Sequence, residues 1–185
     1  MADSSITKAA LSAALKGLME EYHFDKISVG DICKQCSMSR KSFYYHFKDK
    51  YELINWIFDT EFIAVVQKKS YEAGWDFLAD LCEYLYANRK FYHSALQIQG
   101  QNAFSEHFRE MVRPAVSERL RQIRPDIQMN QFQVDFLTDG SVFSIIRWIQ
   151  SNPCSPPEVF LDQVKQVTQV LAVKVYDDMK HEESG

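Results

Sequence analysis

Apolar residues recur every three or four positions along most of this chain, the spacing that places them on one face of an α-helix. No segment of useful length alternates with the two-residue period of a β-strand. The pattern therefore predicts an all-α fold of about nine helices. The helical segments are residues 5–22, 28–36, 39–46, 48–69, 75–86, 91–98, 104–123, 131–150 and 158–180.

Capping residues and turns divide the chain into a small N-terminal unit, residues 1–47, and a larger helical body, residues 48–185. Ser28 stands at the start of one helical segment with Asp31 three positions later, which is a variant of the capping box. Ser39 is the N-cap candidate of the next segment. A tight connection separates these two helices, so the N-terminal unit ends in two short helices.

Charge is distributed unevenly along the chain. The 185 residues carry a formal net charge of −4, whereas residues 26–50 hold six basic and two acidic side chains, net +4, which leaves −8 for the rest. This asymmetry predicts a basic face on an acidic body. Hydrophobic residues make up 46% of the chain, which is enough for a packed core.

Nothing in the sequence indicates a membrane or an oxidising compartment. No apolar run approaches the roughly 20 residues that span a bilayer, and the N-terminus lacks a basic segment followed by an apolar one. Four cysteines in a long, core-rich chain are not typical of a disulfide framework. We therefore expect no membrane partner and a cytoplasmic location.

Two short helices joined by about three residues, the second beginning at Ser39, make a helix-turn-helix unit. A helix fits the major groove of B-form DNA, where its N-terminal residues reach the base edges. Arg40 and Lys41 suit guanine or phosphate, and the side chains of Tyr44 and Lys50 suit the phosphate backbone. The sequence thus predicts double-stranded DNA as a partner. The expected contact residues are Ser28, Ser39, Arg40, Lys41, Ser42, Tyr44, Tyr45, His46 and Lys50.

A run of marked positions joins the helix-turn-helix to the helix after it: Ile32, Met38, Ser39, Phe43, Tyr44, Tyr45, His46, Phe47, Lys50 and Leu53. With these residues, the stretch from Ser28 to Leu53 resembles the DNA-binding unit of TetR/AcrR-family transcriptional regulators. The most specific portion is Tyr-x-x-Phe-x-x-Lys-x-x-Leu. The resembling unit covers residues 6–53, about a quarter of the chain.

Three shorter stretches also carry a resemblance: Gly74-Trp75, Asn88–Tyr92, and Gly100-Gln101-Asn102-Ala103-Phe104. They are similar to the C-terminal domain of a Firmicutes-type subgroup of the same family, which includes regulators similar to the activator of dihydroxyacetone kinase operons. The resemblance implies a body that holds an effector pocket or a partner surface. It also implies that the last two helices dimerise as a four-helix bundle.

Five positions depart from the family pattern, and one of them is His23, where the family often has glycine. The family usually has small residues at Cys33 and Cys36, for which cysteine is an acceptable replacement in a core. A redox or metal pair is the alternative, although no second pair or nearby histidine completes a zinc set. At Ser37 the family often has glycine, so Ser37 either adopts a left-handed conformation or the turn differs slightly. Gly30 stands where some members carry a polar side chain that contacts DNA.

An effector pocket in the body is expected from aromatic side chains whose polar atoms need a partner when buried. Ordinary core packing is the alternative for these rings. For His107, the alternative is a position at the surface or in a polar part of the core. Arg147 can bind an anionic effector or, as the preferred interpretation, pair with Asp135 or Asp139 in the dimer seam. The expected lining residues are Trp75, Tyr92, Phe104, His107, Arg147 and Trp148.

The last two helical segments imply burial on two sides, since residues 131–150 are apolar almost all round and residues 158–175 carry an apolar stripe. One side can meet the body, and a symmetric homodimer is the commonest way to cover the other. A two-fold dimer also places two recognition helices about 34 Å apart, one turn of DNA. A thickly packed monomer is the alternative. The expected interface residues are Phe136, Phe143, Phe160, Val164, Val167 and Leu171.

These observations favour a dimeric transcriptional regulator, a repressor that binds a palindromic operator and is released by an effector bound in the C-terminal domain. The alternative is a co-regulator whose C-terminal domain binds a protein partner instead of a small molecule. An enzyme is not expected, because the sequence has no glycine-rich phosphate loop, nucleophile elbow or metal-ligand cluster. No cofactor and no metal are expected either.

Overall fold

The computed structural model describes residues 2–69, 71, 75–98, 103–123 and 128–182, with the backbone alone for residues 2, 3, 123 and 171–182. These residues contain helices and no strand, which confirms the expected all-α fold. Gly74 and the turn expected at residues 100–102 lie outside the described residues. Of the helices described, none combines the length and apolar character needed to cross a bilayer.

The helices follow the expected segments closely. Helix α4, the π-helical turn η2 and helix α5 continue one another, so the described chain has nine helices when these three count as one. In chain order the elements are α1 (Ala2–Glu21), the 3-10 turn η1 (Phe24–Lys26), α2 (Val29–Gln35), α3 (Arg40–His46), α4 (Lys50–Phe58), η2 (Asp59–Ile63), α5 (Ala64–Val66), α6 (Asp76–Ala87), α7 (Arg89–Ala95), α8 (Phe104–Ile123), α9 (Gln131–Gln150) and α10 (Pro157–Glu182).

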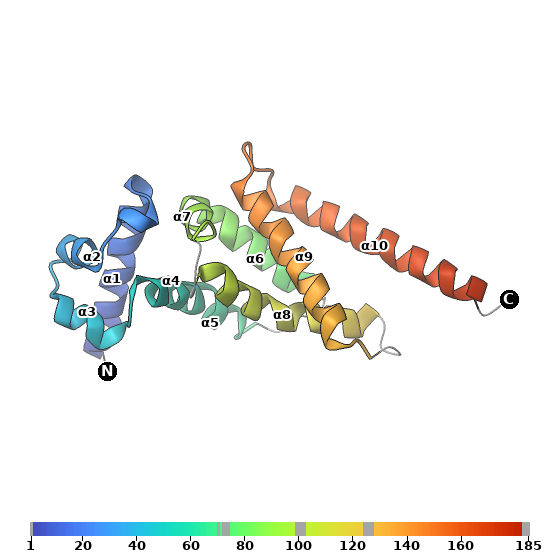
Figure 1. Ribbon diagram of the computed structural model, residues 1–185, viewed down its shortest axis with the longest axis horizontal. Coiled ribbons are helices and arrows are strands. Elements are labelled where there is room, and N and C mark those ends of the chain that lie inside the picture. The colour runs from blue at the N-terminus through green and yellow to red at the C-terminus, as the bar shows by residue number, and fades with distance from the viewer. Residues whose placement is uncertain (1, 70, 72–74, 99–102, 124–127, 183–185) are drawn as a thin grey trace.

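The first three helices form the N-terminal unit at one end of the molecule (Figure 1). The expected capping box starts α2: the Ser28 hydroxyl accepts a hydrogen bond from the Asp31 amide at 3.1 Å, and the Asp31 carboxylate accepts one from the Ser28 amide at 2.8 Å. Asp49 caps α4 in a similar way, by accepting bonds from two amides at 2.9 Å. Local sequence signals therefore set where these helices begin.

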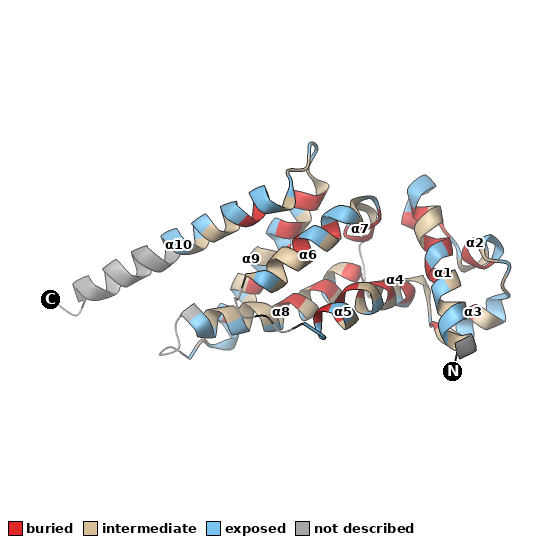
Figure 2. Cartoon of the chain, turned by 180° about the vertical axis from the view of Figure 1, so that it is seen from behind, coloured by how far each residue is buried: buried red, intermediate tan, exposed pale blue. Residues whose placement is uncertain are grey.

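Helices α4 to α5 run from the N-terminal unit into the body, where α4 packs against α1 and α8. Helix α9 packs against α8, α7 and α6, and α10 packs against α6 before it extends past the end of the body (Figure 1). Buried residues gather where these helices face one another and on the first turns of α10 (Figure 2). Pro114 lies inside α8.

An aromatic cluster centred on Phe58 fills the middle of the body. The centroid of its ring lies 5.4 to 6.3 Å from the centroids of five other rings, in edge-to-face and stacked arrangements that favour attraction. The five rings come from η2, α6, α7 and α8, and Phe58 itself belongs to α4, so this cluster joins five elements. The five rings belong to Phe62, Tyr84, Tyr92, Phe104 and Phe108.

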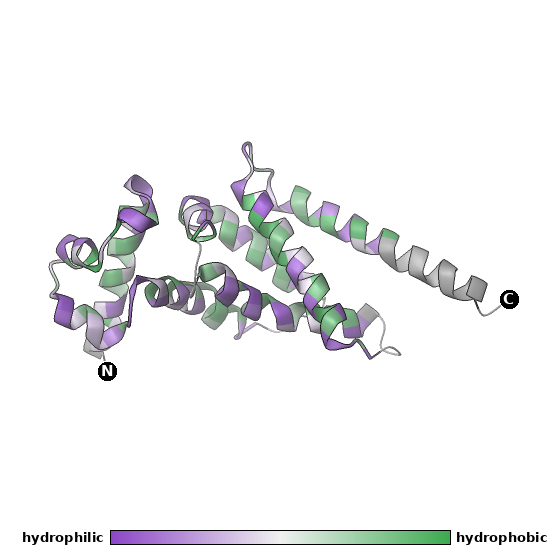
Figure 3. Ribbon diagram, viewed as in Figure 1, coloured by the Kyte–Doolittle hydropathy of each residue, from purple (hydrophilic) through white to green (hydrophobic). Residues whose placement is uncertain are grey.

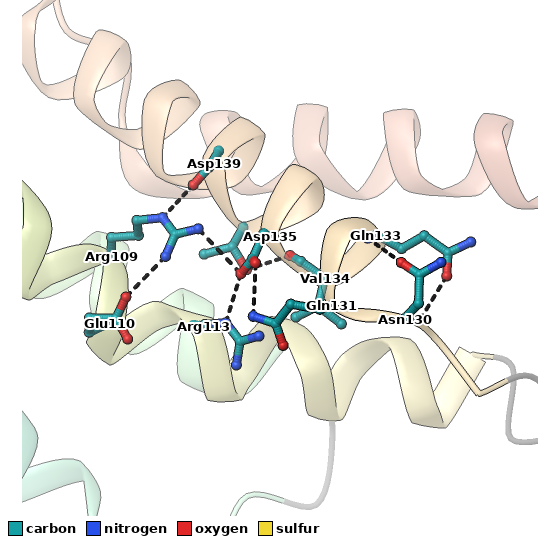
Figure 4. A network of polar contacts seen from close by, with 10 residues as sticks. Arg109, Glu110, Arg113, Asn130, Gln131, Gln133, Val134, Asp135 and Asp139 are labelled. Atoms are coloured by element: carbon teal, nitrogen blue, oxygen red, sulfur yellow. Dashed lines mark hydrogen bonds and ion pairs between the residues drawn. The ribbon is translucent and has the colours of Figure 1, made fainter.

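Helices α8 and α9 are held together by ion pairs (Figure 4). The Arg113 guanidinium donates to Asp135 at 2.9 Å, and Arg109 pairs with Asp139 and with Asp135, the latter at 3.3 Å. Within one chain, the two aspartates expected as partners of Arg147 in the dimer seam are paired with α8. The hydrogen bond from Arg113 is the main cause that holds the pKa of Asp135 below its usual value.

The Asp135 ion pairs give the chain an acid-sensitive contribution to stability. A carboxylate whose pKa is lower in the folded chain contributes stability above its unfolded pKa, about 3.9, and that contribution is lost as the pH falls through the folded value. We therefore expect Asp135→Asn to be less stable than the parent chain at pH 6 and to lose less stability on acidification. Urea unfolding at pH 6 and at low pH measures both effects.

The control for this prediction is Asp162→Asn. In the parent chain the Asp162 carboxylate lies 3.9 Å from the Lys165 ammonium. Equal pH dependence in all three chains would contradict the assignment.

Candidate DNA-binding interface

The turn between α2 and α3 sets the direction of the recognition helix. Ser37 has a φ of 55°, so it takes the left-handed conformation that the sequence left open, at a cost of order 1 kcal/mol for a residue with a Cβ. The Met38 amide donates to the Cys33 carbonyl at 2.8 Å, and the Cys33 thiol donates to the Ser39 carbonyl at 3.7 Å. Ser39 caps α3 by accepting a bond from the Ser42 amide at 3.1 Å. The cysteine thus packs inside the helix-turn-helix.

Helix α3 divides its side chains between the core and solvent. Phe43 and Phe47 are buried and anchor the helix on the N-terminal unit. Tyr44 and Tyr45 are exposed, the latter by 84% of its surface. Large exposed rings are unusual on a surface without a partner, so this face is a candidate interface. One shallow hollow on it is lined by Ser39, Lys41, Ser42, Tyr44 and Tyr45.

Arg40 stands at the first turn of α3 and is oriented by its neighbours. Its Nη2 donates to the Tyr44 hydroxyl at 3.4 Å, and its guanidinium carbon lies 5.9 Å from the centroid of that ring. A Cβ added to Gly30 of α2 would lie 3.9 Å from Nη1, an ordinary contact distance, so the guanidinium lies close beside α2. A planar, oriented guanidinium at the N-terminal end of a recognition helix can bind guanine through two hydrogen bonds.

Two expected contact residues are engaged within the protein instead. The Lys50 ammonium donates to the carbonyls of Phe24 and Ile27, both at 2.7 Å, and lies 4.1 Å from the Phe24 ring centroid. Burial lowers the pKa of Lys50, which fits an ammonium turned inward. The Ser28 hydroxyl donates to Asp31 at 2.6 Å as part of the helix cap. We therefore revise the phosphate contact expected of Lys50 and give this side chain a structural role.

This revision predicts different effects for two lysines. Lys50→Ala is expected to lower the free energy of unfolding by about 1.5–3 kcal/mol, because two carbonyls lose a charged donor. It should leave the salt dependence of DNA binding unchanged. Lys41→Ala should leave stability unchanged and reduce the slope of log affinity against log salt by about 1. Urea unfolding and DNA titration at several salt concentrations measure these quantities. A reduced slope in Lys50→Ala would show that Lys50 does contact a phosphate, and this revision would be wrong.

Half of the residues expected in an effector pocket meet around Phe58. Tyr92 and Phe104 are fully buried there, with ring centroids 5.5 Å apart. His107 Nε2 makes a 2.7 Å hydrogen bond with Asp59, which is a satisfied polar contact at the edge of the cluster. The rings contact one another closely in this region, so the core-packing alternative describes Tyr92 and Phe104 better than a pocket lining does.

The other three residues of the expected pocket lie elsewhere, so the six do not form one site. Trp75 stacks under the guanidinium of Arg119, whose central carbon is 4.6 Å from the ring. Trp148 stacks on Phe160 at 4.6 Å and donates its indole N–H to a backbone carbonyl. Arg147 is exposed on α9 above the ring of Phe143. Helical periodicity alone did not show that these side chains face different directions.

A polar network at the contact between the N-terminal unit and the body was not expected from the sequence. Lys16 of α1 pairs with Glu61 of η2, and the Tyr84 hydroxyl donates to the same carboxylate at 3.1 Å. Tyr84 and Tyr92 also share a 2.8 Å hydrogen bond. The π-helical turn brings Glu61 to this place, and such turns are frequent at functional sites. No residue pattern signals a π-helical turn, so sequence reasoning had no means to find it.

The outer face of α9 exposes large rings. Phe132, Phe136 and Phe143 are 75%, 67% and 60% exposed, and Val167 on α10 is 60% exposed. Figure 3 shows hydrophobic positions along both α9 and the described part of α10. Phe136, Phe143 and Val167 were expected at a dimer interface, and all three face solvent in the single chain. An apolar stripe of this kind usually marks an interaction surface.

Two residues expected at that interface belong to the core of the chain instead. Phe160 is buried against Trp148, and Val164 packs against the core as a partly buried residue. The reason is that α10 begins against α6 and then extends past the body, so the same apolar stripe is covered at its start and uncovered further along (Figure 2). The side chain of Leu171 lies outside the described residues.

Comparison with known proteins bears on both parts of the chain. Residues 10–57 match the family model of bacterial regulatory proteins of the tetR family, and residues 75–170 match a TetR-type transcriptional regulator C-terminal region. The HTH-type dhaKLM operon transcriptional activator DhaS of Lactococcus lactis subsp. lactis (strain IL1403) is 34% identical over 109 residues. That match covers 58% of this chain and 57% of the relative, so it spans little more than half of either protein.

Solved structures share the fold. A dihydroxyacetone kinase operon activator DhaS superposes with a TM-score of 0.66 at 22% identity, over 90% of this chain and 96% of that one. A TetR transcriptional regulator from Streptococcus agalactiae 2603V gives a TM-score of 0.67 at 19% identity, over 87% of this chain and 92% of that one. At these identities the likeness shows the fold alone.

Proposed function

Because this chain belongs to the TetR family of bacterial transcriptional regulators, we propose that it is a homodimeric repressor that binds a palindromic operator. Proteins of this family regulate transcription by binding DNA and are not enzymes, as the sequence indicated. Within the proposal, residues 1–47 form the DNA-binding domain and residues 48–185 the ligand-binding and dimerisation domain. A regulator that binds the bacterial chromosome works in the cytoplasm, which is the location we propose.

The exposed face of α3 is the observation that carries the proposal. Arg40 is the base-reading residue, since it is oriented at the first turn of the helix by Tyr44. Lys41 and the hydroxyls of the two tyrosines lie beside it and suit phosphates. The short serines at the N-cap and first turn let the backbone approach the groove closely. His46 packs edge-to-face against Tyr45 with ring centroids 4.9 Å apart and supports the same face.

A two-fold dimer through α9 and α10 supplies the second recognition helix. The exposed rings of α9 and the exposed valines of α10 provide an apolar surface that a second copy can cover. Two recognition helices about one turn of DNA apart would then match a palindromic site. An effector bound to the body would release the operator by favouring a state in which the two helices are differently spaced.

A second candidate is a regulator whose body binds a protein partner in place of a small molecule. Two observations favour it: the aromatic cluster around Phe58 leaves that part of the body filled, and one relative is named as a transcriptional activator. Under this candidate, the operator contacts of α3 are unchanged. The two candidates differ in the direction of regulation and in what binds the body.

A reporter gene behind the DNA upstream of this chain's own gene tests the direction of regulation. Under the proposal, removal of the protein raises reporter expression, and the variant Arg40→Ala behaves like the removal. Lower reporter expression after removal of the protein would mean that the protein activates transcription, and would favour the second candidate. The control variant is Lys68→Ala, which changes an exposed lysine of the body and should repress like the parent chain.

A further inference from the structure

A crevice lies where the end of α1 faces the body. One wall is formed by Glu20 of α1, and the other by α7 together with Gln150 at the end of α9. Its volume is about 420 Å³, within the range of small-molecule sites. None of the six residues expected to line an effector pocket contributes to it. The α7 side chains that line it include Arg89, Lys90 and His93.

The cationic side of the crevice is organised before any ligand binds. Arg89 Nε donates to the Ile149 carbonyl at 2.9 Å, and Nη2 donates to the Ser151 carbonyl. These bonds cap the last turn of α9 and fix the plane of the guanidinium. A guanidinium carries five N–H donors, so this anchoring uses two of them and leaves others for a ligand. Preorganised donors of this kind reduce the ordering cost of binding.

The remaining lining residues narrow the chemistry of the ligand. Lys90 and His93 follow Arg89 on α7 and place two further nitrogen-bearing groups on the same wall. Ser94 and Gln150 can exchange hydrogen bonds with hydroxyl groups, and Glu20 can accept one from a hydroxyl. The set suits a small molecule with a phosphate or carboxylate at one end and hydroxyl groups at the other.

We propose that this crevice is the effector site of the protein and binds a small hydroxylated organic anion. The inference rests on the proposed function, because it places the effector of that regulator between α1 and the body. A ligand that contacts both walls stabilises one placement of the N-terminal unit relative to the body. The spacing of two recognition helices in a dimer depends on that placement, so occupancy of the crevice changes operator affinity.

Calorimetric titration of the full chain tests the site with three probes: inorganic phosphate, 3-phosphoglycerate and citrate. The uncharged control is glycerol, and potassium chloride matches the ionic strength. We expect saturable binding of 3-phosphoglycerate and none of glycerol. Lys90→Glu should raise the Kd about tenfold or more, since it reverses a charge in the crevice. Saturable binding of none of the three anions would overturn the proposal.

Two matched variants locate the binding. Lys68→Glu makes the same charge change on an exposed lysine outside the crevice, and Arg40→Ala removes the guanidinium of the DNA-binding face. Both should bind 3-phosphoglycerate with the Kd of the parent chain. An equal loss in Lys68→Glu and Lys90→Glu would mean general charge attraction, and a loss in Arg40→Ala would place the anion on the DNA-binding face. Either result overturns the crevice as the site.

The coupling to DNA is measured separately, so that the two proposals can fail independently. Operator affinity with saturating 3-phosphoglycerate should differ by about fivefold or more from affinity in potassium chloride of equal ionic strength. Lys90→Glu should lose this difference and still bind the operator. Anion binding with unchanged operator affinity would overturn the effector role. Failure to bind the operator without any anion would instead overturn the proposed function.

Discussion

Phe136→Asp on the outer face of α9 is expected to dissociate the dimer and with it most of the operator binding. Phe136 is 67% exposed in the single chain, beside the ring of Phe132, which is 75% exposed, at a centroid distance of 6.2 Å. A two-fold interface uses the same patch twice, so one substitution buries two carboxylates without partners. Such unpaired charges cost about 3–5 kcal/mol, which raises the dimer dissociation constant by roughly 100- to 1000-fold or more.

Sedimentation analysis at micromolar concentration measures the oligomeric state of this variant. Val65→Asp serves as the control, because Val65 is also an exposed apolar residue, 49% exposed, but lies on α5. The control should sediment as the parent dimer, and Phe136→Asp as a folded monomer with unchanged helix content. A parent chain that is monomeric at this concentration, or a Phe136→Asp chain that stays dimeric, would show that α9 does not form the interface.

Arg40→Ala carries the second large expected effect. Loss of one bidentate contact to guanine costs about 1–3 kcal/mol, or roughly 10- to 100-fold in operator affinity. The discrimination against other bases should fall at one position of each half-site and nowhere else. Titration with operators substituted at single base pairs measures both quantities. Arg40 is exposed and contacts the Tyr44 side chain, so the fold should tolerate the change.

Arg40→Lys separates base recognition from charge. It keeps the positive charge but removes the planar fork, so it should retain most of the salt dependence and lose most of the base discrimination. Lys68→Ala should match the parent chain in both respects. Unchanged operator affinity in Arg40→Ala would mean that the recognition helix contacts DNA through other residues, and the assignment of the base-reading role would be wrong.

Local signals in the sequence predicted the N-terminal unit well. Ser28 and Ser39 cap α2 and α3 as expected, and Ser37 takes the left-handed conformation that was one of two alternatives. These features depend on residues a few positions apart, whose types restrict the backbone directly. The helix periodicity of the body was equally informative, since apolar spacing reports the period of a helix regardless of its neighbours.

Contacts between distant segments were not predictable in the same way. The sequence placed Lys50 near phosphates, but its ammonium binds carbonyls more than 20 residues away. It placed Phe160 in a dimer interface, but Trp148 covers that ring within the chain. In each case the sequence indicated on which face of its helix the residue lies, but not which element packs against that face. The crevice beside Arg89 was missed for the same reason, since its walls come from three parts of the chain.

We propose that α3 reads DNA as part of a two-fold dimer. Fluorescence anisotropy tests it with the duplex from upstream of the chain's own gene and a scrambled duplex of equal composition, at two salt concentrations. We expect the upstream duplex to bind more tightly, with two chains per site and an affinity that falls steeply with salt. Equal, weak binding of both duplexes, or one chain per site, would contradict it.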